Sequence, residues 1–127
     1  MNILDIIGPV MIGPSSSHTA GACRLALLAA GILGSLPQQA EIVLHGSFAR
    51  TYKGHGTDRA LAAGLMGWGP DDPRIPNALE TMHEQGLQFH FRAGDLGSSV
   101  HPNTVAFRMQ DAQEHVCEVV GSSIGGG

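Results

Sequence analysis

Two loops of this chain are dense in side chains that could bind an anion or move a proton. The first is Ser15-Ser16-Ser17-His18-Thr19, which runs directly into a helical segment. A helix start presents backbone N–H groups with partial positive charge, and neighbouring hydroxyls add further donors. Such a loop can hold a carboxylate or a phosphate. Ser and Thr are also frequent helix N-caps, so ordinary capping explains one of these hydroxyls, and both interpretations stay open.

The second loop is Lys53-Gly54-His55-Gly56-Thr57-Asp58. Glycines on both sides of His55 allow the backbone to approach a ligand closely and leave the imidazole free to project. Asp58 lies three residues further on, where its carboxylate can orient that ring or cap the helix that follows. The alternative interpretation is a mobile turn with an exposed histidine.

Other histidines give weaker signals. His45 and Ser47 lie on either side of a glycine at the end of a strand-like segment, where they could line the same cleft. For residues 101–104, His-Pro-Asn-Thr, a structural turn is favoured because Pro102 fixes the backbone. Three further histidines have no converging partners: His83, His90 and His115. The sequence has no zinc-type spacing and no cluster-forming set of cysteines, so no metal ligands are predicted in this chain.

Length, composition and charge limit the class of protein. The 127 residues suit one domain with one core, and a hydrophobic content of 43% is ordinary for a globular protein. A formal net charge of −4 gives no reason to expect nucleic acid or an anionic membrane as a partner. The sequence lacks a signal-like basic region and a membrane-length apolar stretch, so a cytoplasmic protein is predicted. Cys23 and Cys117 lie in apolar and strand-like segments and are predicted to be buried.

Hydrophobic periodicity predicts the elements that position these loops. A short helix or turn is expected over residues 2–10, and longer helices over residues 19–33, 57–67 and 75–85. Strands are expected over residues 41–48, 87–93, 104–109 and 115–120, the last two as a hairpin. This order predicts an α+β fold with helices packed on one four-stranded, mostly antiparallel sheet. Residues 1–120 would form the domain, and residues 121–127 a linker or the start of a further portion.

Two of the helical segments, residues 22–33 and 60–68, carry too few polar residues for simple surface helices. One face of them could dock a partner domain or a second copy of the chain. Burial inside this domain is the alternative.

Taken together, the loops resemble the β portion of bacterial iron–sulfur-dependent L-serine dehydratases. Residues 12–21 are similar to the opening signature of that family, and residues 45–49, 53–58 and 101–104 to its later motifs, in the expected order. The tail at residues 123–127 also resembles the family, so the likeness covers essentially the whole chain. One departure is a cysteine at position 23, in a stretch where the family more often has proline. It affects none of the roles below.

The resemblance implies part of a lyase that converts L-serine to pyruvate and ammonia by α,β-elimination. It implies a [4Fe–4S] cluster, held by three cysteines of an α portion that lies outside this chain, and no cofactor bound by this chain alone. L-serine and the cysteine-bearing α domain or subunit would be its partners, and the complete enzyme would be a homodimer. This chain by itself would be inactive.

The resemblance also implies roles for residues of the two loops. Removal of the α-proton of serine needs a positioned base, for which an imidazole is suited. His55 is the candidate and His18 the alternate. Asp58 would orient His55, and Lys53 would add positive charge. Substrate binding is assigned to hydroxyl and imidazole groups, the first four of which would hold the carboxylate: Ser15, Ser16, Ser17, Thr19, His45, Ser47 and Thr57.

Two other functions stay open. A non-catalytic regulatory module that binds L-serine or another small carboxylate would use the same loops, since anion capture at a helix start needs no chemistry. Such a module would tolerate the loss of His55 with a near-normal maximal rate. A phosphate-binding domain of unrelated function is suggested by the serine-rich loop alone.

Overall fold

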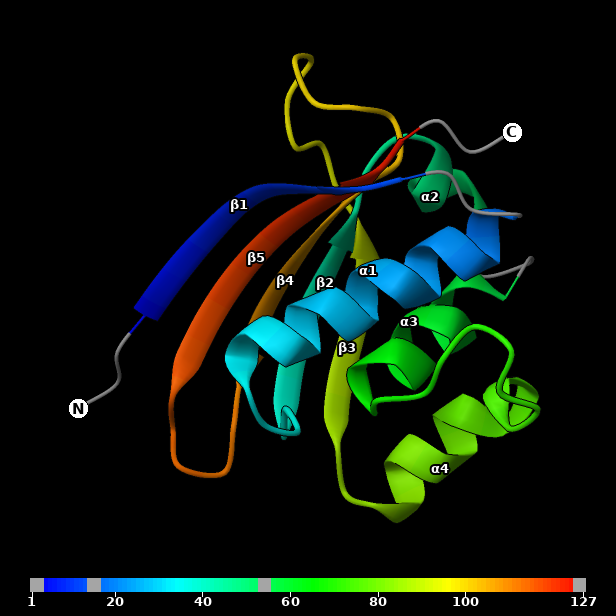
Figure 1. Cartoon of the computed structure of the whole chain (residues 1–127), viewed down its shortest axis with the longest axis vertical. Helices are drawn as coiled ribbons and strands as arrows, with labels where there is room; N and C mark the ends of the chain where they lie inside the picture. Colours follow the sequence, from blue (N-terminus) through cyan, green and yellow to red (C-terminus); the bar gives the residue numbers. More distant parts are fainter. Residues whose placement is uncertain (1–3, 14–16, 53–55, 125–127) are drawn as a thin grey trace.

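The computed structural model describes residues 4–13, 17–52 and 56–124. Within these residues, a five-stranded sheet in the order β1-β5-β4-β2-β3 forms one layer and helices form the other (Figure 1). The strands are β1 (Leu4–Ile12), β2 (Gln39–Leu44), β3 (Gln88–Ala93), β4 (Thr104–Gln110) and β5 (Val116–Ser123). The helices are α1 (His18–Leu33), α2 (Ser47–Thr51), α3 (Thr57–Leu65) and α4 (Ala78–Glu84), the last preceded by a 3-10 turn at Ile75–Asn77. The predicted α+β class is confirmed.

The sheet is not the four-stranded, mostly antiparallel one that was predicted. β2 pairs with β4 and β4 with β5 in antiparallel fashion, but β1 runs parallel to β5 and β2 parallel to β3. The parallel β2–β3 pair has a clear physical cause, because α2, α3 and α4 lie between the two strands in the chain. Parallel neighbours need such a crossover. The predicted hairpin, by contrast, is confirmed as β4 and β5.

The first segment was predicted wrongly as a short helix or turn, since Leu4–Ile12 forms β1. Gly8 and Pro9 interrupt this strand without ending it, and the pairing register with β5 shifts where they occur. β1 is the last strand on its side of the sheet. An edge strand tolerates proline because one side of its backbone needs no ladder partner.

β5 continues to Ser123 and so passes residue 120, where the domain was expected to end. Ser122 and Ser123 are buried, and the hydroxyls of Ser122 and Thr104 lie 2.7 Å apart. Residues 121–123 therefore belong to the sheet.

The core lies between the sheet and α1, which crosses it (Figure 1). Alternate residues of the three central strands are buried on this side: Ala40, Ile42 and Leu44, then Val105, Phe107 and Met109, then Cys117 and Val119. Both cysteines are buried, as predicted. The Cys23 thiol donates to the Trp68 carbonyl oxygen, and burial raises the pKa of this thiol to about 11. In the described part of the chain, every helix is too short or too polar to span a bilayer.

Helices α1 and α3 touch at Gly64. A Cβ atom at this position would lie 2.4 Å from the Cys23 carbonyl oxygen and 2.6 Å from the Ala26 Cβ. Every residue of α3 from Ala60 to Leu65 is buried. The apolar character of this segment is therefore explained by burial within the chain, the simpler of the two interpretations offered above.

We expect Gly64→Ala to lower the free energy of unfolding by about 1–3 kcal/mol, because the new methyl group overlaps the backbone of α1. Gly31→Ala is the matched control, since it makes the same change within α1 with nothing within 4 Å of the new methyl. It should raise stability by about 0.5–1 kcal/mol through helix propensity alone. Urea denaturation followed by circular dichroism measures both variants. Two changes of the same sign would contradict the close α1–α3 contact.

Candidate functional site

Three of the motif loops meet at the N-terminus of α1. The loop after β2 is held to the loop before β4 by two backbone hydrogen bonds. His45 N–H donates to the Thr104 carbonyl, and Ser47 N–H donates to the Pro102 carbonyl, each at 3.0 Å. Figure 1 shows the start of α1 and all of α2 at this end of the sheet. Residues far apart in sequence therefore share one small region.

His18 is the centre of this region. Its Nε2 lies 3.1 Å from Asn103 Oδ1, in a partly buried hydrogen bond. Its ring stacks on Phe48, with centroids 4.5 Å apart and planes inclined by 22°. Phe48 is fully buried, so it forms a fixed platform for the imidazole.

The hydrogen bond to Asn103 sets the tautomer of His18. An amide oxygen only accepts, so Nε2 carries the proton and donates it. In the neutral ring, Nδ1 then holds the lone pair and can accept a proton. An imidazole held by an orienting group through one nitrogen, with the other nitrogen basic, is the arrangement that a general base needs.

The loop that carries Asn103 is itself well supported. Asn103 N–H donates to His101 Nδ1 at 3.0 Å, and the Thr104 hydroxyl donates to the His101 carbonyl oxygen. Asn103 also accepts a backbone hydrogen bond from Ser123 N–H. The chain bends at residues 102–103, next to the proline that favoured a turn, and this bend presents an amide to His18. Sequence reasoning missed Asn103 and Phe48 as partners of His18; the one available signal was a polar side chain directly after a proline-fixed turn.

The approach of the two loops depends on Gly46. Its φ is +59° and its ψ is −124°, a combination that residues with a side chain rarely adopt. A Cβ there would lie 2.3 Å from the Pro102 carbonyl oxygen. Glycine is required for both reasons.

The serine-rich loop is described only from Ser17 onward, and Ser15 and Ser16 lie outside the described residues. Ser17 Oγ accepts from Ala20 N–H at 3.1 Å and lies 3.2 Å from Thr19 Oγ1. Ser17 is therefore the N-cap of α1. Capping accounts for this one hydroxyl, while the roles of the other three stay predictions.

A cleft opens beside Ser17 and Thr19, and its opposite wall includes Asp71 and Asp72. Hydrogen bonds from Arg74, including one of 2.7 Å to the carboxylate, hold the pKa of Asp72 below its usual value. Arg74 forms an ion pair with Asp72 and balances the charge of one of the two carboxylates on this wall.

His45 and Ser47 lie where the sequence placed them, at the end of β2. His45 Nδ1 accepts from Leu96 N–H at 3.0 Å, and Asp95 Oδ1 lies 3.8 Å from the same nitrogen. The His45 proton is therefore on Nε2, which can donate to a ligand. Ser47 Oγ accepts from Arg50 Nη2 at 3.4 Å.

The glycine-flanked loop is described only at its end, and Lys53 and His55 lie outside the described residues. Asp58 N–H donates to the Tyr52 carbonyl, which ties the end of α2 to the start of α3. Asp58 Oδ1 accepts from Arg59 N–H at 2.8 Å. Thr57 is fully buried, so a substrate would reach its side chain only after a rearrangement.

The chemistry of the described residues does not fit an iron–sulfur cluster. Within them, no group of three or more His, Cys, Asp or Glu side chains could hold a metal ion. Cluster ligands are thiolates. The Cys23 thiol, with a pKa of about 11, stays protonated at neutral pH and is engaged with Trp68.

Comparisons with known proteins give one consistent result. A family model described as serine dehydratase beta chain matches residues 2–127. The chain is 50% identical over 125 residues to the L-serine dehydratase beta chain of Peptoniphilus asaccharolyticus, covering 97% of this chain and 55% of that protein. It is 46% identical over 126 residues to the probable L-serine dehydratase beta chain of Bacillus subtilis (strain 168), covering 99% and 56%. It is 32% identical over 145 residues to L-serine dehydratase 1 of Escherichia coli (strain K12), covering 93% and 31%. The chain thus spans about half the length of the two beta chains it matches.

Proposed function

The chain belongs to the serine dehydratase beta chain family, and on this premise we propose that it forms part of an L-serine dehydratase, a lyase that converts L-serine to pyruvate and ammonia. The observation that carries the proposal is the hydrogen bond between His18 and Asn103 where three motif loops meet. It supports a site in which an oriented imidazole faces a substrate held at the start of α1. We place this enzyme in the cytoplasm, where it would degrade serine.

The reaction removes the α-proton and the β-hydroxyl of serine and leaves an enamine. The enamine becomes an imine, which water hydrolyses to pyruvate and ammonia. The hydroxyl is a poor leaving group, and a Lewis acid assists its departure. The described residues of this chain do not fit the [4Fe–4S] cluster expected for that task. In our proposal its cysteine ligands therefore belong to the α domain or subunit, and this chain binds the substrate and moves its proton.

Proton abstraction is the first task of this chain. In our proposal His55 takes the α-proton of serine. Asp58 orients the His55 ring, and Lys53 adds positive charge to the site. His18 is the alternate base, or the hydrogen-bond partner that fixes the substrate. The geometry of His18 supports either role, because its Nδ1 is basic while Nε2 is held by Asn103.

Substrate positioning is the second task. We propose that Ser15, Ser16 and Thr19 hold the carboxylate with the backbone N–H groups at the start of α1. Ser17 supports them as the helix cap. His45 and Ser47 line the same site from the end of β2. The proton on His45 Nε2 suits contact with a carboxylate oxygen.

The test is anaerobic pyruvate formation from L-serine by this chain alone, and by the chain combined with its cysteine-bearing partner. We expect no product from the chain alone, because its described residues include no group that could hold the cluster, and turnover from the combination. His83→Ala, an exposed change on α4, serves as the control and should leave the rate unchanged.

Either of two results would contradict the proposal. An iron-replete combination without turnover would favour a regulatory module that binds serine or another small carboxylate. Pyruvate formed by the chain alone would mean that the hydroxyl is activated within it.

A further inference from the structure

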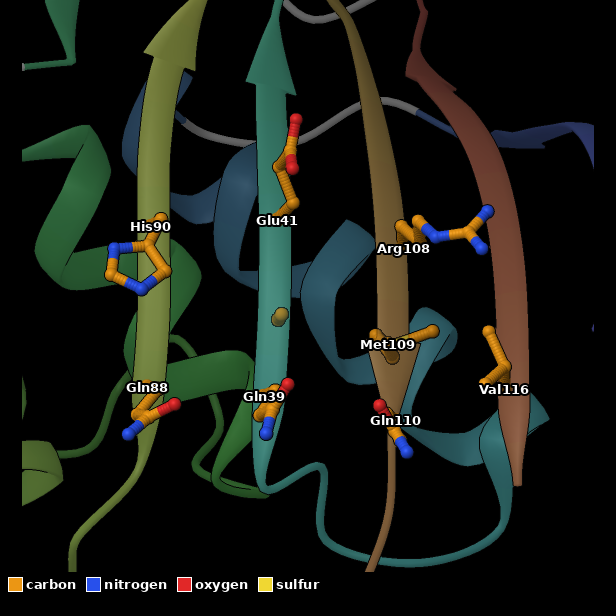
Figure 2. A pocket seen from close by; sticks show the side chains of 9 residues that line it. Gln39, Glu41, Gln88, His90, Arg108, Met109, Gln110 and Val116 are labelled. Atoms are coloured by element: carbon orange, nitrogen blue, oxygen red, sulfur yellow. The ribbon is translucent and has the colours of Figure 1, made fainter. Parts of the chain in front are cut away.

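The face of the sheet opposite α1 carries ordered rows of side chains. In the pairing register, Glu41 is opposite His90 on β3 and opposite Arg108 on β4, and Arg108 is opposite Glu118 on β5. One row across the four strands therefore reads His, Glu, Arg, Glu. Figure 2 shows the first three of these side chains standing on their strands, with helices behind the sheet.

The rows on either side have a different character. Toward one end the row has three glutamines and one valine: Gln88, Gln39, Gln110 and Val116. Toward the other end it contains Arg92 and three small apolar residues: Val43, Ala106 and Val120. These apolar side chains are only partly buried. None of the helices that the structure describes covers this face.

The charges on this face balance one another. Glu41 pairs with Arg92 at 3.0 Å, and Arg108 pairs with Glu118 at 3.2 Å. Three of these four side chains are more than half exposed. The face therefore has two positive and two negative groups, and a matching partner must offer the reverse pattern at the same spacing.

A second copy of the same face offers that pattern. Two copies related by a two-fold axis that runs along the strands, between β2 and β4, would be stacked face to face with the order of strands reversed. Each Glu41 would then face Arg108 of the second copy. Each His90 would face Glu118 of the second copy. Val43 and Ala106 would also lie opposite each other across the axis. Leu96, from the loop after β3, lines the same hollow of this face, so it would be part of the apolar centre.

An axis at right angles to the strands would instead set the glutamine row against the apolar row, which leaves polar groups without partners. We therefore propose that this sheet face binds a second copy of the chain through an isologous, charge-paired interface. The proposal does not depend on the proposed enzymatic function.

The size of the face indicates how strong this association is. Four strands spaced by about 4.8 Å and three rows spaced by about 6.8 Å give a footprint of roughly 20 by 20 Å. Packed sheets also cross at about −30°, so pairing is best near the axis, where Glu41 and Arg108 lie. Such a footprint, about 400 Å² per copy, is below that of a stable specific interface and is typical of weak, transient association. We expect a dimer that dissociates on dilution.

Charge reversal tests the proposal by sedimentation velocity of the chain over a range of concentrations. E41R and R108E, taken singly, should each raise the dissociation constant by about 100-fold or more, because each places two like-charged pairs across the axis. An equimolar mixture of the two variants should recover the dimer. In that heterodimer the introduced arginine faces the introduced glutamate, and the native Arg108 faces the native Glu41.

The recovered heterodimer separates interface repulsion from simple unfolding, since a misfolded variant would not be rescued by its complement. R24E and E84R reverse exposed charges on α1 and α4, on the helical side, and should leave the dissociation constant unchanged. A chain that stays monomeric at high concentration would overturn the proposal. So would a dimer that is insensitive to both reversals.

Discussion

His55→Ala in the complete enzyme is expected to lower kcat for pyruvate formation by about 10²-fold or more while KM changes little, because loss of a general base removes an interaction of the transition state. His18→Ala is expected to raise KM and to lower kcat less, if His18 fixes the substrate. Steady-state kinetics under anaerobic conditions measures both. A His55→Ala enzyme within a few-fold of the native kcat would rule out His55 as the base.

The pH dependence of kcat/KM distinguishes more sharply whether His18 or His55 is the general base. Asn103→Asp keeps an acceptor oxygen at His18 but adds a negative charge, which stabilises the protonated imidazole. If His18 is the base, the acid limb of the kcat/KM profile moves to higher pH, because the ring stays protonated over a wider range. If His55 is the base, the limb keeps its position. Asn103→Leu, which removes the acceptor, should not move the limb upward in either case.

The long helices were predictable because their signals are local. α1 begins after its N-cap, Ser17, and ends at Gly34, which has a φ of +85°. The long apolar run between these two residues is typical of a buried helix. The five-residue α2 was missed, since the strand pattern of residues 41–48 continued across it. β1 was missed because Gly8-Pro9 in the middle of an apolar run is typical of a turn. Gly8-Pro9 is tolerated within β1 because β1 is an edge strand. The edge position depends on the order of all the strands in the sheet, which local sequence does not indicate.

The sheet order and the centre of the site were beyond local patterns for a related reason. Alternation of apolar and polar residues indicates which face of a strand is buried, but not whether its neighbour runs parallel. His18 and Asn103 are 85 residues apart. The resemblance assigned the motifs that contain His18 and Asn103 to the same family. It did not indicate that the two side chains are in contact, which only the folded structure shows.

Gly46→Ala is expected to have the second large effect, on stability and on the site together. The new methyl group would overlap the Pro102 carbonyl oxygen, at a backbone conformation that already disfavours a side chain. Backbone strain of about 1–2 kcal/mol and overpacking of about 1–3 kcal/mol together predict a loss of about 3 kcal/mol in the free energy of unfolding. Gly34→Ala is the control, since Gly34 also has a positive φ but has nothing within 4 Å of a new Cβ. It should cost only the backbone strain.

The same variant tests whether the loop contact sets the tautomer of His18. If the loop of residues 101–104 is pushed away from Gly46, Asn103 no longer holds Nε2, and the proton distributes between the two ring nitrogens. Ring ¹⁵N chemical shifts should then change from a single Nε2–H form to a mixture in Gly46→Ala and stay unchanged in Gly34→Ala. Turnover of the complete enzyme should fall at least tenfold in the first variant, because a base or hydrogen-bond donor displaced by about 1 Å loses much of its effect. A folded Gly46→Ala chain with a native His18 tautomer would show that Asn103 is held by its own turn, and that the close approach at Gly46 serves only packing.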